Sequence, residues 1–201
     1  MAKYTENTES IKKSKIYNSI PKQLGKENKK FKYSLVEKSA RAREYETSLE
    51  WLISSNMVLK CQGINAPKSP LKANTDENFK LYLSDMGILR VLSNIEKNEI
   101  LLNKNMLYKG VIAENYVAQI LYAKNKEIYY WQLGSEYEVD FIINKGDIIP
   151  IEVKANDNTT SKSLNYYINR YKPKYSIRIS TKNFGFSNNI KSIPIYAAHL
   201  L

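Results

Sequence analysis

The residues from Glu138 to Lys154 (EVDFIINKGDIIPIEVK) combine two acids and a lysine with a pattern typical of two β-strands. The first strand carries Asp140, and the second carries Glu152 and Lys154 two positions apart. Because residues i and i+2 of a strand point to the same side of a sheet, Glu152 and Lys154 share one face. Burying such charges against apolar strands costs free energy unless they bind something. The residue types favour a divalent metal ion and a phosphodiester.

A short loop is expected to join these two strands and to set their register. Residues Asn144–Gly146 suit a three-residue hairpin loop that ends in a glycine with positive φ. This loop places Phe141 opposite Ile149 and makes Asp140 and Glu152 diagonal neighbours, about 7–8 Å apart at Cα. A slip of one residue would set acids opposite isoleucines, so the pattern favours this register.

Composition excludes several kinds of site. The single cysteine (Cys61) and single histidine (His199) of the 201 residues exclude disulfide frameworks and Cys/His zinc sites. They also argue against Cys–His and Ser–His catalysis. A metal ion would need carboxylate and carbonyl oxygens as ligands, which suit Mg²⁺ or Mn²⁺.

The charge and hydropathy of the chain indicate its partners. The net charge of +11 favours a polyanion, above all nucleic acid, although a genome of low G+C content would also enrich lysine, asparagine and tyrosine. No apolar run approaches the roughly 20 residues needed to span a bilayer. The N-terminal residues lack the hydrophobic region of a secretory signal. We therefore expect a cytoplasmic protein without a membrane partner.

The first part of the chain predicts a winged-helix-like domain over residues 1–94. A helix interrupted at Pro21 is followed by a short possible strand, a strong helix and two strands separated by a proline-containing loop. The predicted ranges are Glu9–Gly25, Phe31–Val36, Ala40–Ser54, Met57–Ile64 and Phe79–Ser84. Ser39 is a possible N-cap of the strong helix.

The second part, residues 95–201, begins with a linker to about Asn105 and then predicts the order α-β-β-β-α-β with a further strand. The elements flanking the hairpin are Tyr108–Lys124 (helix), Ile128–Gln132 (strand), Ser161–Tyr171 (helix), Ser176–Ser180 (strand) and Ile193–Ala197 (strand). The chain as a whole is expected to be an α/β (α+β) protein with a mixed sheet.

This order, with Asp on the second strand and Glu-x-Lys on the third, resembles the restriction-endonuclease-like core of PD-(D/E)xK nucleases. Asp140, Glu152 and Lys154 match the motif, and Glu114 on the preceding helix supplies the further acid often found there. The chain also resembles the C-terminal region, a domain of unknown function, of a family of bacterial and archaeal AAA+ ATPases. That resemblance rests on Ile20–Leu52, Phe79–Leu89, AEN at 113–115, Tyr129–Ile143, Ile149–Ala155, SKSL at 161–164 and Ile193–Ala197.

One departure from this family concerns ATP. The sequence contains no GxxxxGK[ST] phosphate loop, so we expect neither an ATP site nor ATPase activity in this chain. The ATPase module of the family, or a related partner, is an expected binding partner.

The resemblance implies a Mg²⁺- or Mn²⁺-dependent nuclease acting on DNA. Asp140, Glu152 and the Val153 carbonyl would hold the metal, with Glu114 binding directly or through water. Lys154 would orient or deprotonate the attacking water, or stabilise the phosphorane. Phosphates could also contact Lys162 and Ser163, at the start of the next helix, and Arg41 and Arg43, on the possible recognition helix.

Other interpretations remain open at this point. Glu152 and Lys154 could be an ordinary surface pair, Lys162 and Ser163 plain surface or cap residues, and Arg41 and Arg43 a contact surface for the ATPase module. The whole chain could be a non-catalytic DNA-binding or assembly module, or a protein-interaction tail in a defence or toxin–antitoxin setting.

Overall fold

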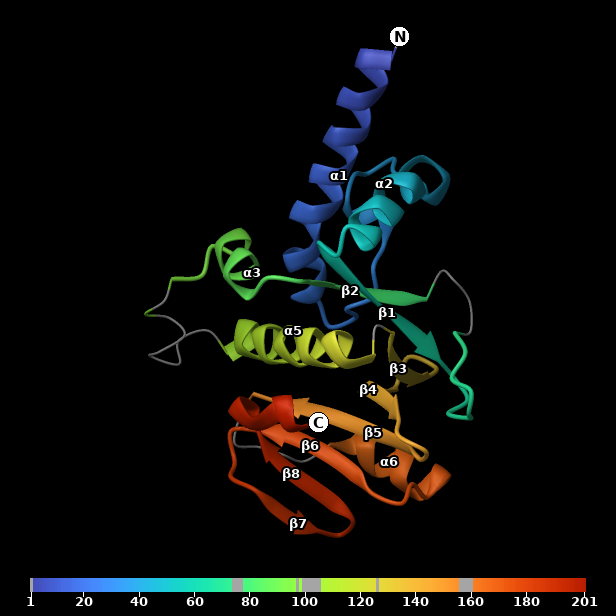
Figure 1. Cartoon of the computed structure of the whole chain (residues 1–201), viewed down its shortest axis with the longest axis vertical. Helices are drawn as coiled ribbons and strands as arrows, with labels where there is room; N and C mark the ends of the chain where they lie inside the picture. Colours follow the sequence, from blue (N-terminus) through green and yellow to red (C-terminus); the bar gives the residue numbers. More distant parts are fainter. Residues whose placement is uncertain (1, 74–77, 97, 99–105, 126, 156–160) are drawn as a thin grey trace.

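The protein folds around one mixed sheet of eight strands, flanked by helices (Figure 1). The computed structural model describes residues 2–73, 78–96, 98, 106–125, 127–155 and 161–201. The strand order is β2-β1-β3-β4-β5-β6-β8-β7. The helices are α1 (Ala2–Leu24), α2 (Ala42–Ser54), α3 (Met86–Leu92), α5 (Met106–Asn125) and α6 (Lys162–Tyr171), with 3₁₀ turns η1 (Tyr33–Leu35) and η2 (Ile195–Leu200). The strands are β1 (Val58–Ile64), β2 (Phe79–Leu83), β3 (Ile128–Leu133), β4 (Tyr137–Asn144), β5 (Ile148–Lys154), β6 (Ser176–Ser180), β7 (Gly185–Ser187) and β8 (Ile190–Pro194).

The two strands predicted to form a wing belong to the common sheet. β1 pairs with β2 antiparallel and with β3 parallel, so hydrogen bonds link the two parts of the chain directly. Three predicted elements were wrong. α1 continues through Pro21 to Leu24, and the possible strand at Phe31–Val36 is the turn η1. The last predicted strand, Ile193–Ala197, is misplaced, because β8 ends at Pro194 and the 3₁₀ turn η2 begins at Ile195. The predicted boundary at residue 94 stays a prediction, and most of the linker that follows it lies outside the described residues.

Two apolar layers hold the helices to opposite faces of the sheet. The larger layer joins α1, α2 and α5 to strand residues such as Phe141 and Ile151. The smaller layer joins α6, through Leu164 and Tyr167, to Trp131 and Ile142. Figure 1 shows α5 and α6 separated by the central strands. Among the described residues, no helix is both long and apolar enough to cross a membrane.

The central hairpin forms as predicted, with a register that differs by two residues. Phe141 pairs with Ile151, rather than with Ile149, and the last pair before the turn is Asn144 with Ile148. The glycine with positive φ, Gly146, therefore lies in the middle of the three-residue loop instead of at its end. A shift of two residues preserves the side-chain alternation of β5, so Glu152 and Lys154 stay on the face opposite to Ile151.

A bulge in β4 lies beside this hairpin. Tyr129 pairs with Ile142 and Trp131 pairs with Val139, so three steps along β4 span two steps along β3. Asp140 is one of the residues between these two pairs. Bulges bend a strand and can redirect a side chain, and they are common next to active sites.

Candidate functional site

Asp140 lies where β4 and β5 stop pairing with each other. The ladder of paired residues ends at Phe141 and Ile151. Beyond it, the Asp140 carboxylate accepts a hydrogen bond of 2.8 Å from the Val153 backbone N–H. The side chain thus replaces a strand–strand hydrogen bond that the diverging backbones no longer make. Continuing the observed register would bring Asp140 directly opposite Glu152. The ladder does not continue, however, and the carboxylate of Asp140 is held by the backbone N–H of Val153, the residue after Glu152.

Glu152 is buried and only half satisfied. Its Oε1 atom accepts hydrogen bonds from the Ser161 hydroxyl at 2.9 Å and from Lys154 Nζ at 2.8 Å. Its Oε2 atom is buried and has no hydrogen-bond partner among the described residues. A carboxylate oxygen in this condition is costly unless a cation or a proton is supplied to it. The structure brings Glu152 and Lys154 together as predicted, at the N-terminus of α6.

Glu114, from α5, is held by groups that were not predicted. It accepts hydrogen bonds from Tyr82 Oη at 2.5 Å and from Lys80 Nζ at 3.2 Å, and it forms an ion pair with Lys29. Lys80 is fully buried and also contacts Glu138 at 2.5 Å. The oxygens of Glu114 are thus occupied by protein donors.

The pKa values of Asp140 and Glu114 are shifted in opposite directions from their usual values. Burial, followed by the nearby carboxylates of Glu114 and Glu152, raises the pKa of Asp140 to about 8. For Glu114 burial acts in the same direction, but the ammonium groups of Lys29 and Lys80 outweigh it and hold the pKa at about 2. Like charges that gather in a buried site cannot all be ionised at neutral pH. Asp140 is the member of the group that keeps its proton most readily.

The carboxylates of Asp140, Glu152 and Glu114 are the predicted ligands of a metal ion. Within the described part of the chain, no group of three or more acid, histidine or cysteine side chains is arranged so that it could hold a metal ion. Two observations nonetheless point to an unmet need for positive charge: the unpartnered Oε2 of Glu152 and the raised pKa of Asp140. Asp140 and Glu152 are therefore the residues that could hold a divalent cation. The role of Glu114 as a third ligand stays a prediction.

The predicted phosphate contacts occupy different surroundings. The N-cap of α6 is Ser161, which accepts from the Leu164 N–H, while Ser163 Oγ accepts from the Glu138 N–H. Lys162 Nζ lies 5.1 Å from the centre of the Tyr137 ring. Ser161, Lys162 and Ser163 all lie at the start of α6, close to Glu152. The hydroxyl groups of the two serines are already bonded to other groups of the protein.

Arg41 and Arg43 lie on the other part of the molecule. Arg41 is the N-cap residue of α2, a position predicted for Ser39, and its backbone N–H donates to the side chain of Glu44. Figure 1 places α2 beside α1, at the end of the molecule away from α6. The structure therefore does not bring these arginines to the acid cluster.

Asn115 is a further residue whose part in the site was not predicted. Its side chain accepts from the Leu83 N–H at 2.9 Å and donates to the Leu83 carbonyl at 2.8 Å. The amide thereby acts as a backbone segment would, and it fixes α5 to the end of β2. Asn115 is part of the AEN segment, one of the segments that carry the family resemblance. Its place in that segment was the signal in the sequence that it has a structural role. Lys80 had a signal too, because the ammonium group of a lysine within the apolar strand FKLYL must find a partner if the strand is buried.

These features define a mixed α+β protein with a buried acid–lysine cluster at the divergence of two central strands. In the comparisons with known families, residues 109–198 match a model described as "Domain of unknown function (DUF4143)". Residues 1–99 match a second model, described as "Domain of unknown function (DUF8612)". Neither the curated proteins nor the solved structures include a significant match.

Proposed function

We propose that this protein is a metal-dependent nuclease of the PD-(D/E)xK type, acting on DNA. The observation that carries the proposal is the pair Asp140 and Glu152, which share the divergence of β4 and β5 and need positive charge, with Lys154 in contact with Glu152. The element order α5-β3-β4-β5-α6-β6 agrees with a restriction-endonuclease-like core. The match over residues 109–198 supports the resemblance to C-terminal regions of AAA+ ATPases, in which this domain is common.

Mg²⁺ or Mn²⁺ held by Asp140 and Glu152, with the Val153 carbonyl, would lower the pKa of a bound water and neutralise charge on the phosphate. Lys154 contributes charge of its own. Burial lowers the pKa of its ammonium group, but Glu152 outweighs this and leaves the pKa above its usual value. Lys154 is thus protonated at neutral pH, which favours stabilisation of the phosphorane over removal of a proton from water.

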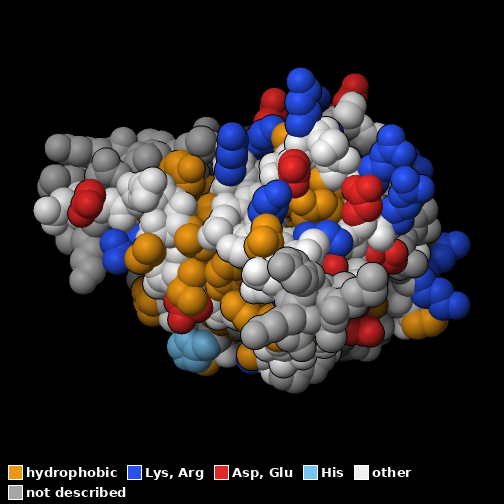
Figure 2. All heavy atoms as spheres, turned by 90° about the horizontal axis from the view of Figure 1, so that it is seen from above, with side chains coloured by type: hydrophobic (Ala, Val, Ile, Leu, Met, Phe, Trp, Pro, Cys, Tyr) orange, Lys and Arg blue, Asp and Glu red, His pale blue; other side chains and the backbone are white. Residues whose placement is uncertain are grey.

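The N-terminal part would supply part of the DNA-binding surface. Figure 2 views the molecule from the end at which α1 begins. Lys and Arg side chains are spread over the upper and right-hand margins of this face. This distribution supports a polyanionic partner. The winged-helix-like assignment of residues 1–94 rests on the element order alone, since β1 and β2 are bonded into the common sheet.

A second candidate function, a binding module without catalytic activity, is favoured by the two lysines that contact Glu114. Lys29 and Lys80 give this acid an internal counter-charge, as expected in a module that keeps the fold but binds DNA or the ATPase module without turnover. The two proposals differ in what they require of Asp140. A nuclease needs it ionised and bound to metal, whereas a binding module does not.

The experiment is a cleavage assay on linear, circular and branched DNA with Mg²⁺, Mn²⁺ or EDTA. We expect cleavage only with metal, and its loss in Asp140→Ala and in Lys154→Ala. Lys174→Ala is the matched control, because that lysine is exposed and lies on the loop before β6. Unchanged activity in Asp140→Ala and Lys154→Ala would reject the site. If the wild type cuts nothing but binds DNA in a salt-sensitive manner, the binding module is correct.

A readout without turnover gives an independent check. Mn²⁺ at pH 8 should raise the melting temperature of the wild type, because a ligand that binds only the folded state stabilises it. Asp140→Asn should remove this shift, and Lys174→Ala should keep it.

A further inference from the structure

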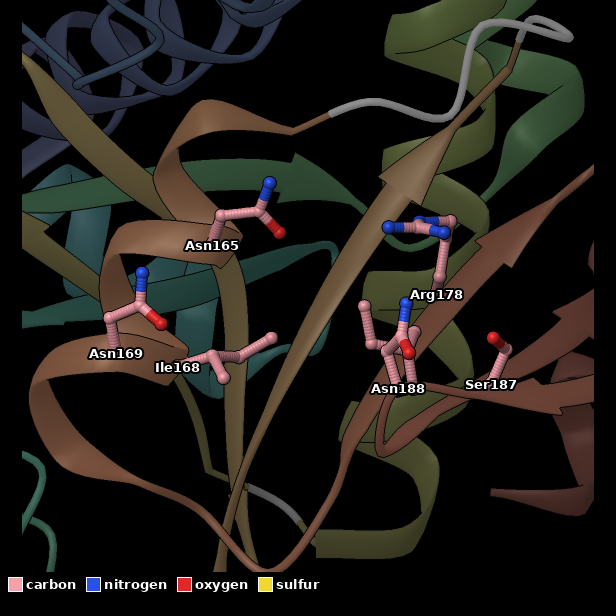
Figure 3. A pocket seen from close by; sticks show the side chains of 7 residues that line it. Asn165, Ile168, Asn169, Arg178, Ser187 and Asn188 are labelled. Atoms are coloured by element: carbon pink, nitrogen blue, oxygen red, sulfur yellow. The ribbon is translucent and has the colours of Figure 1, made fainter.

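A polar cavity lies between α6 and the edge of the sheet formed by β6, β7 and β8. Its volume is about 510 Å³, and its wall contains Asn165 and Asn169 from α6, with Arg178, Ser187 and Asn188 from the opposite side. Figure 3 shows Asn165 and Asn169 on the side of α6, and Arg178, Ser187 and Asn188 on the opposite side. Two isoleucines complete the lining. The size is within the range of about 300–1,000 Å³ that is usual for small-ligand sites.

Arg178 is the charged side chain of this wall, and part of its guanidinium group lacks a partner. Its Nε atom is buried and makes no hydrogen bond with any described residue. Within the described part of the chain, no carboxylate lies within ion-pair distance of its guanidinium group. A buried, unsatisfied donor on a charged group is destabilising, and an anionic ligand would satisfy it. Guanidinium groups bind phosphate oxygens through a planar fork of donors.

The cavity adjoins the acid cluster. In the parallel ladder between β5 and β6, Arg178 is the register partner of Glu152. Neighbouring strands are about 4.8 Å apart, and register partners point to the same face. A phosphodiester chain that passes Glu152 and Lys154 therefore reaches Arg178 within the length of one nucleotide.

We propose that this cavity binds one nucleotide unit of the nucleic-acid substrate. The Arg178 guanidinium contacts its phosphate, and the amides of Asn165, Asn169 and Asn188 contact its sugar and base. Amide side chains offer both a donor and an acceptor, the combination that base edges require. This inference rests on the proposed function and deepens it: it gives the substrate a second contact, next to the phosphodiester at Glu152.

The test measures binding without catalysis. Fluorescence anisotropy in EDTA, with a labelled single-stranded 15-mer of DNA, compares the wild type with Arg178→Gln and Asn169→Leu. Loss of one charge-assisted contact should weaken binding by Arg178→Gln about tenfold or more and reduce the salt dependence by about one ion. Arg170→Gln is the control, because Arg170 is an exposed arginine of α6 outside the cavity wall. It should change the affinity by less than about twofold.

Each outcome supports or overturns the proposal. An affinity of Arg178→Gln equal to that of the wild type, or a loss that Arg170→Gln reproduces, overturns it, as does absence of binding by the wild type. If Arg178→Gln does not fold, as judged by circular dichroism, Asn169→Leu decides the question through the same comparison. A wild type that binds through Arg178 but never cleaves would leave this inference intact and reject the nuclease proposal.

Discussion

Replacing Lys80 by methionine should destabilise the protein far more than replacing an exposed lysine. Lys80 is fully buried, and its ammonium group contacts both Glu114 and Glu138. Methionine has a similar length and no charge, so the variant leaves the buried carboxylates without one of their counter-charges. Removing one partner of a buried ion pair costs about 3–5 kcal/mol. We expect a decrease of that size in the free energy of unfolding.

The same reasoning predicts coupling between Lys80 and Glu114. Glu114→Gln alone leaves Lys80 buried beside an amide, although the amide oxygen can still accept from Tyr82 Oη. In the double variant neither charge is left alone, and Lys29, which is partly exposed, can turn to water. The double variant should therefore cost less than the sum of the single variants, by about 1–2 kcal/mol or more.

The assay is urea denaturation at pH 7, followed by circular dichroism. Lys174→Met is the control, since Lys174 is exposed and its ammonium group lies 3.4 Å from the carboxylate of Asp147, which is also exposed; such pairs contribute about 0–1 kcal/mol. Equal slopes of the unfolding transitions would show that the unfolded states are comparable. A cost for Lys80→Met no larger than that of the control, or strict additivity with Glu114→Gln, would refute the buried network.

Three further predictions concern single residues. Because the pKa of Asp140 is raised to about 8 when folded, the folded state binds more protons than the unfolded state between about pH 4 and pH 8, so its contribution makes stability fall as the pH rises through this window. Asp140→Asn should remove that fall, a difference of about 1–3 kcal/mol at pH 8 after allowance for the partial exposure of the side chain, and parallel curves for the two proteins would contradict it. Asn115→Ala should cost about 2–3 kcal/mol in urea denaturation, because it leaves both the N–H and the carbonyl of Leu83 without their partner, whereas a loss below about 0.5 kcal/mol would show that β2 and α5 do not depend on it. Ser161→Ala should cost about 1 kcal/mol through the lost N-cap, and it should also lower any metal-dependent cleavage, because Ser161 donates a hydrogen bond to Glu152; unchanged stability and cleavage would contradict this role.

The hairpin was predictable because its signals are local. Alternation of apolar residues and a glycine-containing loop define two strands and the face that carries the acids. The register differed by two residues because the positive-φ glycine can occupy either the middle or the end of a three-residue loop, and the sequence does not distinguish these positions. The bulge at Asp140 has no comparable signal, since neither neighbouring residue is a glycine.

The partners of Glu114 could not be predicted from local patterns. Lys29 is 85 residues away from it in sequence and Lys80 is 34 residues away, so the contacts depend on how β2 and the segment after α1 pack on α5. The same packing explains why β1 and β2 were taken for a wing. Their sequences specify two paired strands, but only the tertiary arrangement decides whether β1 is also bonded to β3.

The two proposed functions place different requirements on the net charge of the acid–lysine cluster, because only the nuclease must bind a divalent cation there. The charged members are the acids Glu114, Glu138, Asp140 and Glu152 and the lysines Lys29, Lys80 and Lys154. There is one more acid than lysine, and a proton on Asp140 makes the cluster neutral. A divalent cation would give the neutral cluster a net charge of +2. Loss of the proton from Asp140 lowers this charge to +1, and movement of Lys29 away from Glu114 would make the cluster neutral again. Metal binding to the folded protein should therefore release a proton and strengthen as the pH rises through the pKa of Asp140, about 8, which calorimetry in buffers of different ionisation enthalpy would measure. Metal binding without proton release would mean that the ion occupies another site, and no binding above that pKa would leave the lysine-neutralised cluster as a structural core of a DNA-binding module.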